Sequence, residues 1–267
     1  MRPNKNAIVH KGDDMKSLTS VCMGACLAAV LSIQTSVAQP QQPPGIVEIV
    51  ACNFIGDSDG ADLARPMNSF NTWADRHGID DFNVTTLFPI FTSDAFTYDV
   101  LFMNRWTNAG AMGRGLATFF GPDGDDAVAD FASVVDCSST TAFAGILLRA
   151  PGGARNGGPI QFFNCTVKEN RTLADGIGAI NAWAEASGSR YGTGHAVLLP
   201  LAGENPDASY TFKWVVLHQS FENYGDSLGA LFGQGAPQLG NIIQPVMDCD
   251  SARVYNQVVN RQIRAAN

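Results

Sequence analysis

The chain has 267 residues, with 17 Lys and Arg against 25 Asp and Glu, so its formal net charge at pH 7 is −8. Hydrophobic residues make up 45% of it, which is typical of a globular protein with a buried core. A net negative surface repels phosphate backbones and anionic lipid headgroups, so the composition argues against nucleic-acid and membrane-surface partners.

The first 38 residues have the features of a segment that is removed during export. From Met15, a lysine precedes the apolar run SLTSVCMGACLAAVLSI, and the small residues Ser36 and Ala38 form a cleavage site. This is the pattern of a secretory signal peptide. The run is short and a Pro-rich stretch follows it, which argues against a transmembrane anchor; lipid attachment at Cys26 stays an alternative. We therefore expect residues 1–38 to be an N-terminal extension and signal peptide, and the mature protein to be secreted or periplasmic and free of the membrane.

The remainder of the chain repeats itself. Five short segments occur twice in the same order, at offsets of 110 to 113 residues. The first copies lie around Cys52, Asn71, Leu87, Ala111 and Cys137, and the second copies around Cys165, Asn181, Leu198, Asn223 and Cys249. Five anchors at nearly one offset indicate two homologous halves of domain size. We predict a first half over residues 45–149, a Gly-rich linker over 150–158 and a second half over 159–264.

Each half is predicted to contain six elements in the order βαββαβ. In the first half, hydrophobic periodicity and turn residues predict a strand over 46–54, a helix over 61–78, strands over 82–91 and 97–106, a broken helical region over 111–136 and a strand over 140–148. In the second half the same elements are expected over 160–167, 173–188, 195–201, 210–220, 224–249 and 252–260. This order is the ferredoxin-like pattern.

The cysteines add a test of that pattern. Four remain after removal of the signal segment, Cys52, Cys137, Cys165 and Cys249, and an even number in an exported chain indicates disulfides. In the ferredoxin-like topology the first strand lies between the third and the fourth, so its end faces the beginning of the fourth. We therefore predict bridges from Cys52 to Cys137 and from Cys165 to Cys249. Free buried thiols or a pairing across the halves are the alternatives.

Two such halves in one chain resemble the dimeric α/β-barrel superfamily in its fused form, in which two four-stranded sheets face each other and the helices lie outside. The resemblance covers nearly the whole mature chain, and it concerns element order and duplication, with no family signature. It implies an α+β fold of two tandem ferredoxin-like βαββαβ repeats, and a monomer because the two halves already pair. The superfamily includes cofactor-free monooxygenases, haem enzymes, isomerases and proteins without known chemistry, and none of their residue patterns matches this sequence position by position.

The third strand of each half is apolar on both faces, so we expect one face to lie under the helices and the other to line a shared interior. Asn104 and His218 favour one face as the interior, because polar ends suit a partly wet cavity. That face predicts six ligand-binding residues: Tyr98, Phe102, Trp106, Tyr210, Trp214 and His218. In the alternative orientation the interior is lined by Leu101, Met103, Val215 and Leu217.

The sequence contains no recognisable catalytic motif. Glu48 on the first strand, and His195 and His218 at strand ends, are weak candidates for acid–base catalysis; histidines at strand ends are more often structural. The histidines lack the spacing of a zinc site, so we predict no metal, and nothing indicates a cofactor. Trp73 and Trp183 occupy the same place in the first helix of each half, and we expect both to pack the helix against the sheet.

These features predict an exported protein that binds a small apolar or aromatic molecule in the interior between its two halves, because the candidate lining is aromatic with few charges. The alternative is a small-molecule enzyme, similar to cofactor-free monooxygenases or isomerases. Whether the protein is an enzyme stays open at this point.

Overall fold

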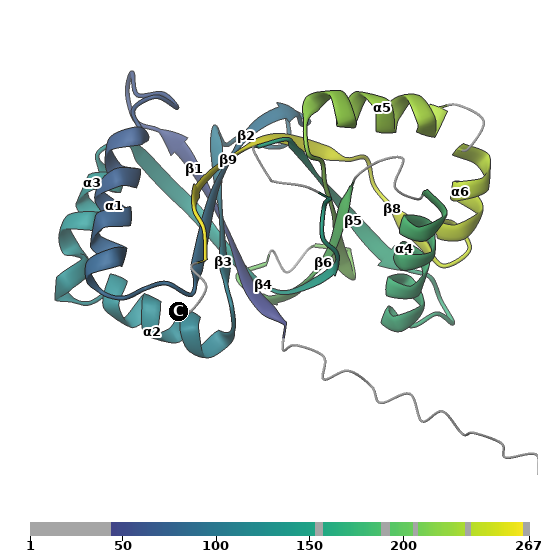
Figure 1. Ribbon diagram of the computed structural model, residues 1–267, viewed down its shortest axis with the longest axis horizontal. Coiled ribbons are helices and arrows are strands. Elements are labelled where there is room, and N and C mark those ends of the chain that lie inside the picture. Colours follow the sequence, from purple (N-terminus) through teal and green to yellow (C-terminus); the bar gives the residue numbers. More distant parts are fainter. Residues whose placement is uncertain (1–43, 153–156, 188–192, 205–207, 233–235, 264–267) are drawn as a thin grey trace, which may run out of the picture. The chain divides into compact units, whose positions relative to one another are not determined.

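A computed structural model describes residues 44–152, 157–187, 193–204, 208–232 and 236–263 (Figure 1). The predicted signal segment, Cys26 and the middle of the predicted linker lie outside the described residues. No helix in these ranges is long and apolar enough to cross a membrane.

The first half contains β1 (Gly45–Phe54), α1 (Ala64–Arg76), β2 (Phe82–Phe91), β3 (Val100–Trp106), α2 (Ala109–Phe119), the 3₁₀ turn η1 (Pro122–Gly124), α3 (Asp125–Ala132) and β4 (Val135–Arg149). The second half contains β5 (Pro159–Val167), α4 (Leu173–Ser187), β6 (Gly194–Ala202), β7 (Phe212–Leu217), α5 (Phe221–Phe232), α6 (Ala236–Ile243), β8 (Met247–Cys249) and β9 (Arg253–Arg261). The predicted order of elements is thus confirmed, except that β4 begins earlier than expected and that the last strand of the second half is divided into β8 and β9.

The strands form one closed antiparallel barrel. Around the ring the order is β7, β6, β4, β1, β3, β2, β9 and β5, and β5 pairs with β7 to complete the circle, while β8 pairs with β5. The halves are joined edge to edge, because β4 pairs with β6 and β2 pairs with β9. The predicted fold class, two tandem ferredoxin-like repeats whose separate sheets face each other, is therefore wrong. Closure pairs the strand edges that two separate sheets would leave open.

The length of β4 makes this closure possible. Its 15 residues pair with β1 over Val135 to Gly145 on one edge and with β6 over Ala142 to Arg149 on the other. The neighbours expected for the first strand of each half are confirmed, since β1 lies between β3 and β4, and β5 lies beside β7, β8 and β9.

Both predicted disulfides are present. Cys52 is bonded to its cross-strand neighbour Cys137, and Cys165 to its cross-strand neighbour Cys249. The first bridge joins residues 85 positions apart in the sequence, and the second joins residues 84 positions apart. Each contributes roughly 2–4 kcal/mol to stability. Disulfides persist mainly in oxidising compartments, so the two bridges fit an extracellular protein.

Helices cover the outside of the barrel on two flanks. Figure 1 shows α1, α2 and α3 beside the strands of the first half, and α4, α5 and α6 beside those of the second. In α1 the buried residues Met67, Phe70, Trp73 and Ala74 recur at helical spacing, so one face of the helix packs on the barrel wall. Trp73 and Trp183 are both buried between a helix and the wall, as predicted.

The interior of the barrel is filled by side chains. Its core includes Leu101, Val215 and Leu217, with Met103 packed against them, together with large residues such as Phe143. Phe102, Trp106 and Trp214 instead lie in the two cores under the helices. The predicted orientation of the third strands was therefore wrong, and the alternative holds. An eight-stranded barrel has little free space inside, and here side chains fill it, while the indole rings of Trp106 and Trp214 lie outside under the helices.

Candidate functional site

Two pockets lie in equivalent places, between the helices and the outer wall of the barrel. The first-half pocket, between β1 and β3 and the helices α1, α2 and α3, has a volume of about 520 Å³. The second-half pocket, between β5 and β7 and the helices α4, α5 and α6, has a volume of about 420 Å³. Both volumes lie in the usual range for small-molecule sites.

The first-half pocket has a mainly aromatic wall. Rings from five elements line it: Phe70, Trp73, Phe82, Phe102, Phe119 and Phe131. Gly115 of α2 allows the helix to approach the wall, because an ideal Cβ at this position would lie 2.1 Å from the ring of Trp106. The exposed part of the lining includes the ring of Phe120, which is 75% exposed, together with the polar residues Asp136 and Thr140.

Glu48 supplies the buried acid of this pocket. Its carboxylate accepts a hydrogen bond of 2.6 Å from the indole nitrogen of Trp106, and the residue is only 8% exposed. Burial raises the pKa of Glu48, and the hydrogen bond from Trp106 opposes part of that rise. Glu48 forms no ion pair with any basic side chain of the described ranges. A carboxyl group in this position can exchange a proton or hold a polar group of a ligand.

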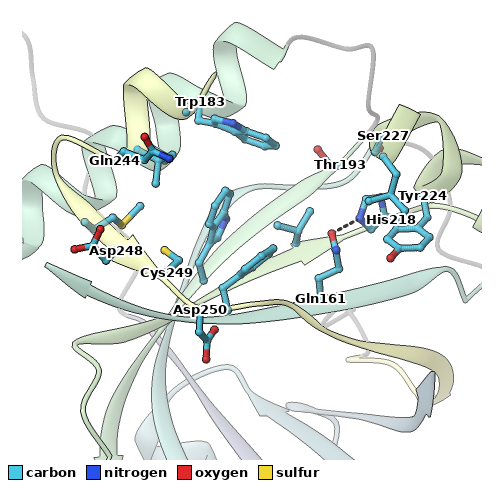
Figure 2. Close-up of a pocket in the computed structure, with 17 residues that line it drawn as sticks. Gln161, Trp183, Thr193, His218, Tyr224, Ser227, Gln244, Asp248, Cys249 and Asp250 are labelled. Atoms are coloured by element: carbon cyan, nitrogen blue, oxygen red, sulfur yellow. Dashed lines mark hydrogen bonds between the residues drawn. The ribbon is translucent and has the colours of Figure 1, made fainter. Parts of the chain in front are cut away.

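A matching polar pair lies in the second-half pocket. Figure 2 shows the side chains of Gln161 and His218 pointing toward one another, with a hydrogen bond of 2.9 Å between His218 Nε2 and Gln161 Oε1. Burial lowers the pKa of His218 to about 4, so the imidazole is neutral at pH 7 and donates this bond from Nε2. The ring of Tyr224 from α5 packs against it, with 5.1 Å between the ring centroids.

The two pairs have the same register in the barrel. Glu48 lies opposite Asn104 on β3, and its partner Trp106 is two residues further along that strand. Gln161 lies opposite Val216 on β7, and its partner His218 is two residues beyond Val216. Side chains two residues apart share a face, so each pair bridges two neighbouring strands on the helix-facing side. The sequence offsets had already made Glu48 equivalent to Gln161 and Trp106 equivalent to His218.

His195 lies behind the second-half pocket and is fully buried. Its Nδ1 accepts a hydrogen bond of 3.3 Å from the indole nitrogen of Trp214, and its Nε2 lies 3.0 Å from the hydroxyl of Thr193. Burial, with smaller contributions from the charges of Arg149 and His218, lowers the pKa of His195 to about 4. Both ring nitrogens are used within the protein, which is typical of a structural histidine.

Tyr98 and Tyr210 lie in neither pocket. The hydroxyl of Tyr98 is 2.5 Å from that of Tyr255, and its ring packs against the barrel interior. The hydroxyl of Tyr210 donates to Glu204, and its ring covers Lys213. The six predicted ligand residues therefore do not form one site. Phe102 and Trp106 line the first-half pocket, Trp214 and His218 line the second-half pocket, and the two tyrosines lie outside both.

The helix residues of the pockets were not predicted from the sequence. The only signal was the apolar spacing of α1 and the phenylalanines at 119 and 131, which indicates packing and does not distinguish a cavity wall from a filled core. In the part of the chain that the structure describes, no group of three or more His, Cys, Asp or Glu side chains could hold a metal ion.

Comparison with solved structures shows that other proteins have a similar overall fold. One similar structure is a candidate monooxygenase from Lactobacillus acidophilus, with 14% identity, a TM-score of 0.50, and coverage of 81% of this chain and 94% of that chain. Another is a candidate monooxygenase from Fusobacterium nucleatum, with 8% identity, a TM-score of 0.50, and coverage of 82% and 94%. No family model matches the sequence, and no curated protein matches it significantly. At such low identity the likeness concerns the fold alone.

Proposed function

We propose that the protein is an exported monomer that binds a small, largely aromatic molecule in the first-half pocket, with Glu48 as the polar anchor. The observation that carries this proposal is the buried carboxyl of Glu48 in an aromatic cavity of about 520 Å³, without a basic partner among the described residues. Apolar walls with one well-placed polar group are typical of small-molecule sites.

The proposed location differs from the interior between the halves that the sequence suggested. Leu87, Phe143 and Ile160 are fully buried inside the barrel and belong to a packed core. The aromatic ligand class is retained, because the rings expected to line the site, Phe102 and Trp106, line the first-half pocket instead.

The polar anchor indicates the kind of ligand. A flat aromatic ring can pack against the aromatic wall that includes Phe70 and Phe102, while a hydroxyl or amine on it meets the carboxyl of Glu48. A ligand that lacks such a group would leave the buried carboxyl without an added partner and would bind more weakly. We therefore propose a phenol-like or aromatic amine ligand class.

A second candidate function is catalysis on the same ligand. The raised pKa of Glu48 favours it, because a carboxyl whose pKa is shifted toward neutrality can accept a proton from a weakly acidic substrate. An oxygenase or isomerase would use such a step. Two similar folds belong to candidate monooxygenases, which is compatible with this reading and does not carry it.

Calorimetric titration with 2-naphthol and with naphthalene tests the binding proposal, because the two probes share a ring system and differ by one hydroxyl. We expect the parent protein to prefer 2-naphthol by about tenfold, as one buried hydrogen bond would provide. Glu48→Ala should abolish this preference and still bind naphthalene. Gln161→Ala is the matched control, since it removes the equivalent polar group from the second-half pocket only.

Equal loss of the preference in both variants, or no loss in Glu48→Ala, would contradict the proposal. Circular dichroism shows whether each variant is folded. Product analysis by mass spectrometry after incubation with 2-naphthol in air separates the two functions: a chemical change that requires Glu48 supports catalysis, and recovery of the intact probe supports binding alone.

A further inference from the structure

Lys213 lies at one end of the barrel interior, away from both pockets. It is on β7, one residue after Phe212, and its side chain shares the inner face of that strand with Val215 and Leu217. Its cross-strand neighbours are Asn164 on β5 and Leu198 on β6. Lys213 is partly exposed, so solvent can still reach this end of the interior.

The contacts of the amine are aromatic and neutral. Lys213 Nζ donates a hydrogen bond of 3.0 Å to Asn164 Oδ1, and it lies 4.1 Å from the ring centroid of Tyr210 and 5.6 Å from that of Phe143. Among the described residues, no carboxylate lies within 4.0 Å of it. An ammonium group here lacks the direct counter-ion that would normally stabilise it.

The charges around Lys213 only partly offset the effect of burial on its pKa. Burial lowers the pKa of Lys213 to about 8; the nearby charges of Glu204 and Asp250 oppose the shift, and that of Arg253 adds to it. Glu204 accepts a hydrogen bond from Tyr210, and Asp250 is bound by Arg253 at 2.7 and 3.2 Å. The Tyr210 ring also attracts the ammonium form, so it holds the side chain in place while opposing its deprotonation.

Lys168 provides a contrast within the same molecule. Residues 44–263 contain only these two lysines. Lys168 Nζ forms an ion pair of 3.2 Å with Asp248, and both side chains are exposed, at 40% and 74%. The amine of Lys168 therefore has a direct counter-ion in an exposed position, which the amine of Lys213 lacks among the described residues.

We propose that Lys213 is a nucleophilic amine that captures a small aldehyde or ketone as an imine. The electron pair of neutral Nζ attacks the carbonyl carbon, and the carbonyl oxygen takes up a proton to give a carbinolamine. Loss of water from the carbinolamine forms the imine, whose nitrogen then takes up a proton from solvent, so the step needs no oxidant or reductant. Tyr210 and Phe143 flank the amine, which favours an apolar substituent on the carbonyl compound. The site is independent of the ligand proposed for the first-half pocket.

Reductive labelling tests this proposal on the intact mature protein. Propanal and cyanoborohydride are added at pH 7, and digestion followed by mass spectrometry gives the rate of propylation at each lysine. We expect Lys213 to react about tenfold faster than Lys168, since a larger fraction of neutral amine outweighs a lower intrinsic nucleophilicity. Lys213→Arg should remove this product and leave the rate at Lys168 unchanged.

Asn164→Asp is the sharper variant, because it places a carboxylate at the hydrogen-bonding position of the amine with almost no change in shape. It should slow labelling of Lys213 about tenfold and leave Lys168 unaffected, since one close opposite charge shifts a pKa by about a unit or more. Lys213 reacting no faster than Lys168, or an unchanged rate in the folded variant, would overturn the proposal.

If Asn164→Asp does not fold, the pH profile of Lys213 labelling in the parent protein tests the proposal instead. A rate at Lys213 that levels off near pH 8 agrees with the lowered pKa. A rate that still rises steeply above about pH 10, as for an ordinary lysine, contradicts it.

Discussion

The first-half and second-half pockets are built from equivalent strands and helices, but they differ in the charge of their central polar pair. In the first half an acid, Glu48, accepts a hydrogen bond from the indole of Trp106. In the second half a neutral amide, Gln161, is bonded to the imidazole of His218. Each pocket therefore has one hydrogen-bond donor and one acceptor at the same register position. The ionisable group is the acceptor, Glu48, in the first half and the donor, His218, in the second. The two sites therefore share one geometry and differ in their proton chemistry.

The surroundings of the two pairs also differ. Gly115 lets α2 approach Trp106, and the first-half pocket is rimmed by exposed aromatic surface at Phe120. Both pockets also have acidic side chains in their lining: Asp136 in the first half, and Asp248 and Asp250 in the second (Figure 2). The exposed aromatic ring and the buried acid of the first-half pocket suit the aromatic ligand that we propose for it.

Replacing the duplicated tryptophans tests whether the two halves are equally well packed, and it should have the largest effect. Trp73 and Trp183 are 3% and 9% exposed, so Trp73→Ala and Trp183→Ala should each lower the free energy of unfolding by about 3–5 kcal/mol. Trp73 also donates a hydrogen bond of 2.7 Å to the backbone of Asp123. Urea unfolding followed by circular dichroism gives both values. A loss below about 1 kcal/mol in one half only would show that the halves are not packed alike.

The two polar pairs are expected to give stability opposite dependences on pH. Burial raises the folded-state pKa of Glu48 above its ordinary value of 4.5, so above pH 4.5 the unfolded chain loses its proton first and the free energy of unfolding falls as pH rises. Glu48→Gln removes this loss. The variant should therefore gain stability relative to the parent at pH 7 and show no such gain at pH 4.

His218 acts in the other direction. Burial lowers its folded-state pKa from 6.5 to about 4, so between these values the unfolded chain binds the proton first and the free energy of unfolding falls as pH falls. His218→Gln should remove a loss of about 1.4 kcal/mol per pH unit in this window, and its advantage should be greatest at pH 4. Unfolding curves for both variants at pH 4, 5.5 and 7 provide the measurement; advantages at the same end of the pH range would contradict the difference between the pairs.

The smallest expected effect concerns the mouth of the first-half pocket. Phe120 is 75% exposed, so Phe120→Ala should change the free energy of unfolding by no more than about 0.5 kcal/mol. Because Phe120 lines the pocket, the same change should weaken 2-naphthol binding measurably. Phe221, which is 49% exposed at the start of α5, serves as the control, and Phe221→Ala should leave binding unaltered. Equal binding losses in both variants would place the entrance elsewhere.

Local patterns in the sequence were sufficient for several features of the structure. The order of strands and helices follows from hydrophobic periodicity and turn residues, which act over a few neighbouring positions. The disulfide pairs followed from placing β1 between β3 and β4, because Cys52 and Cys137 then become direct neighbours across two strands. The internal repeat also made Glu48 equivalent to Gln161 and Trp106 equivalent to His218, and the structure places both pairs in hydrogen-bonding contact.

Only the tertiary structure decided which face of β3 and β7 lies inside and how the sheet ends are closed. Alternation along a strand shows which side chains share a face, but Phe102 and Leu101 are both apolar, so the pattern does not distinguish inside from outside. The available space determines the orientation of these strands. Leu101 and Val215 fit inside the barrel, whereas Trp106 and Trp214 occupy the layer under the helices. Closure likewise rests on backbone hydrogen bonds between β4 and β6 and between β2 and β9, which depend on long-range geometry and carry little side-chain signal in the sequence.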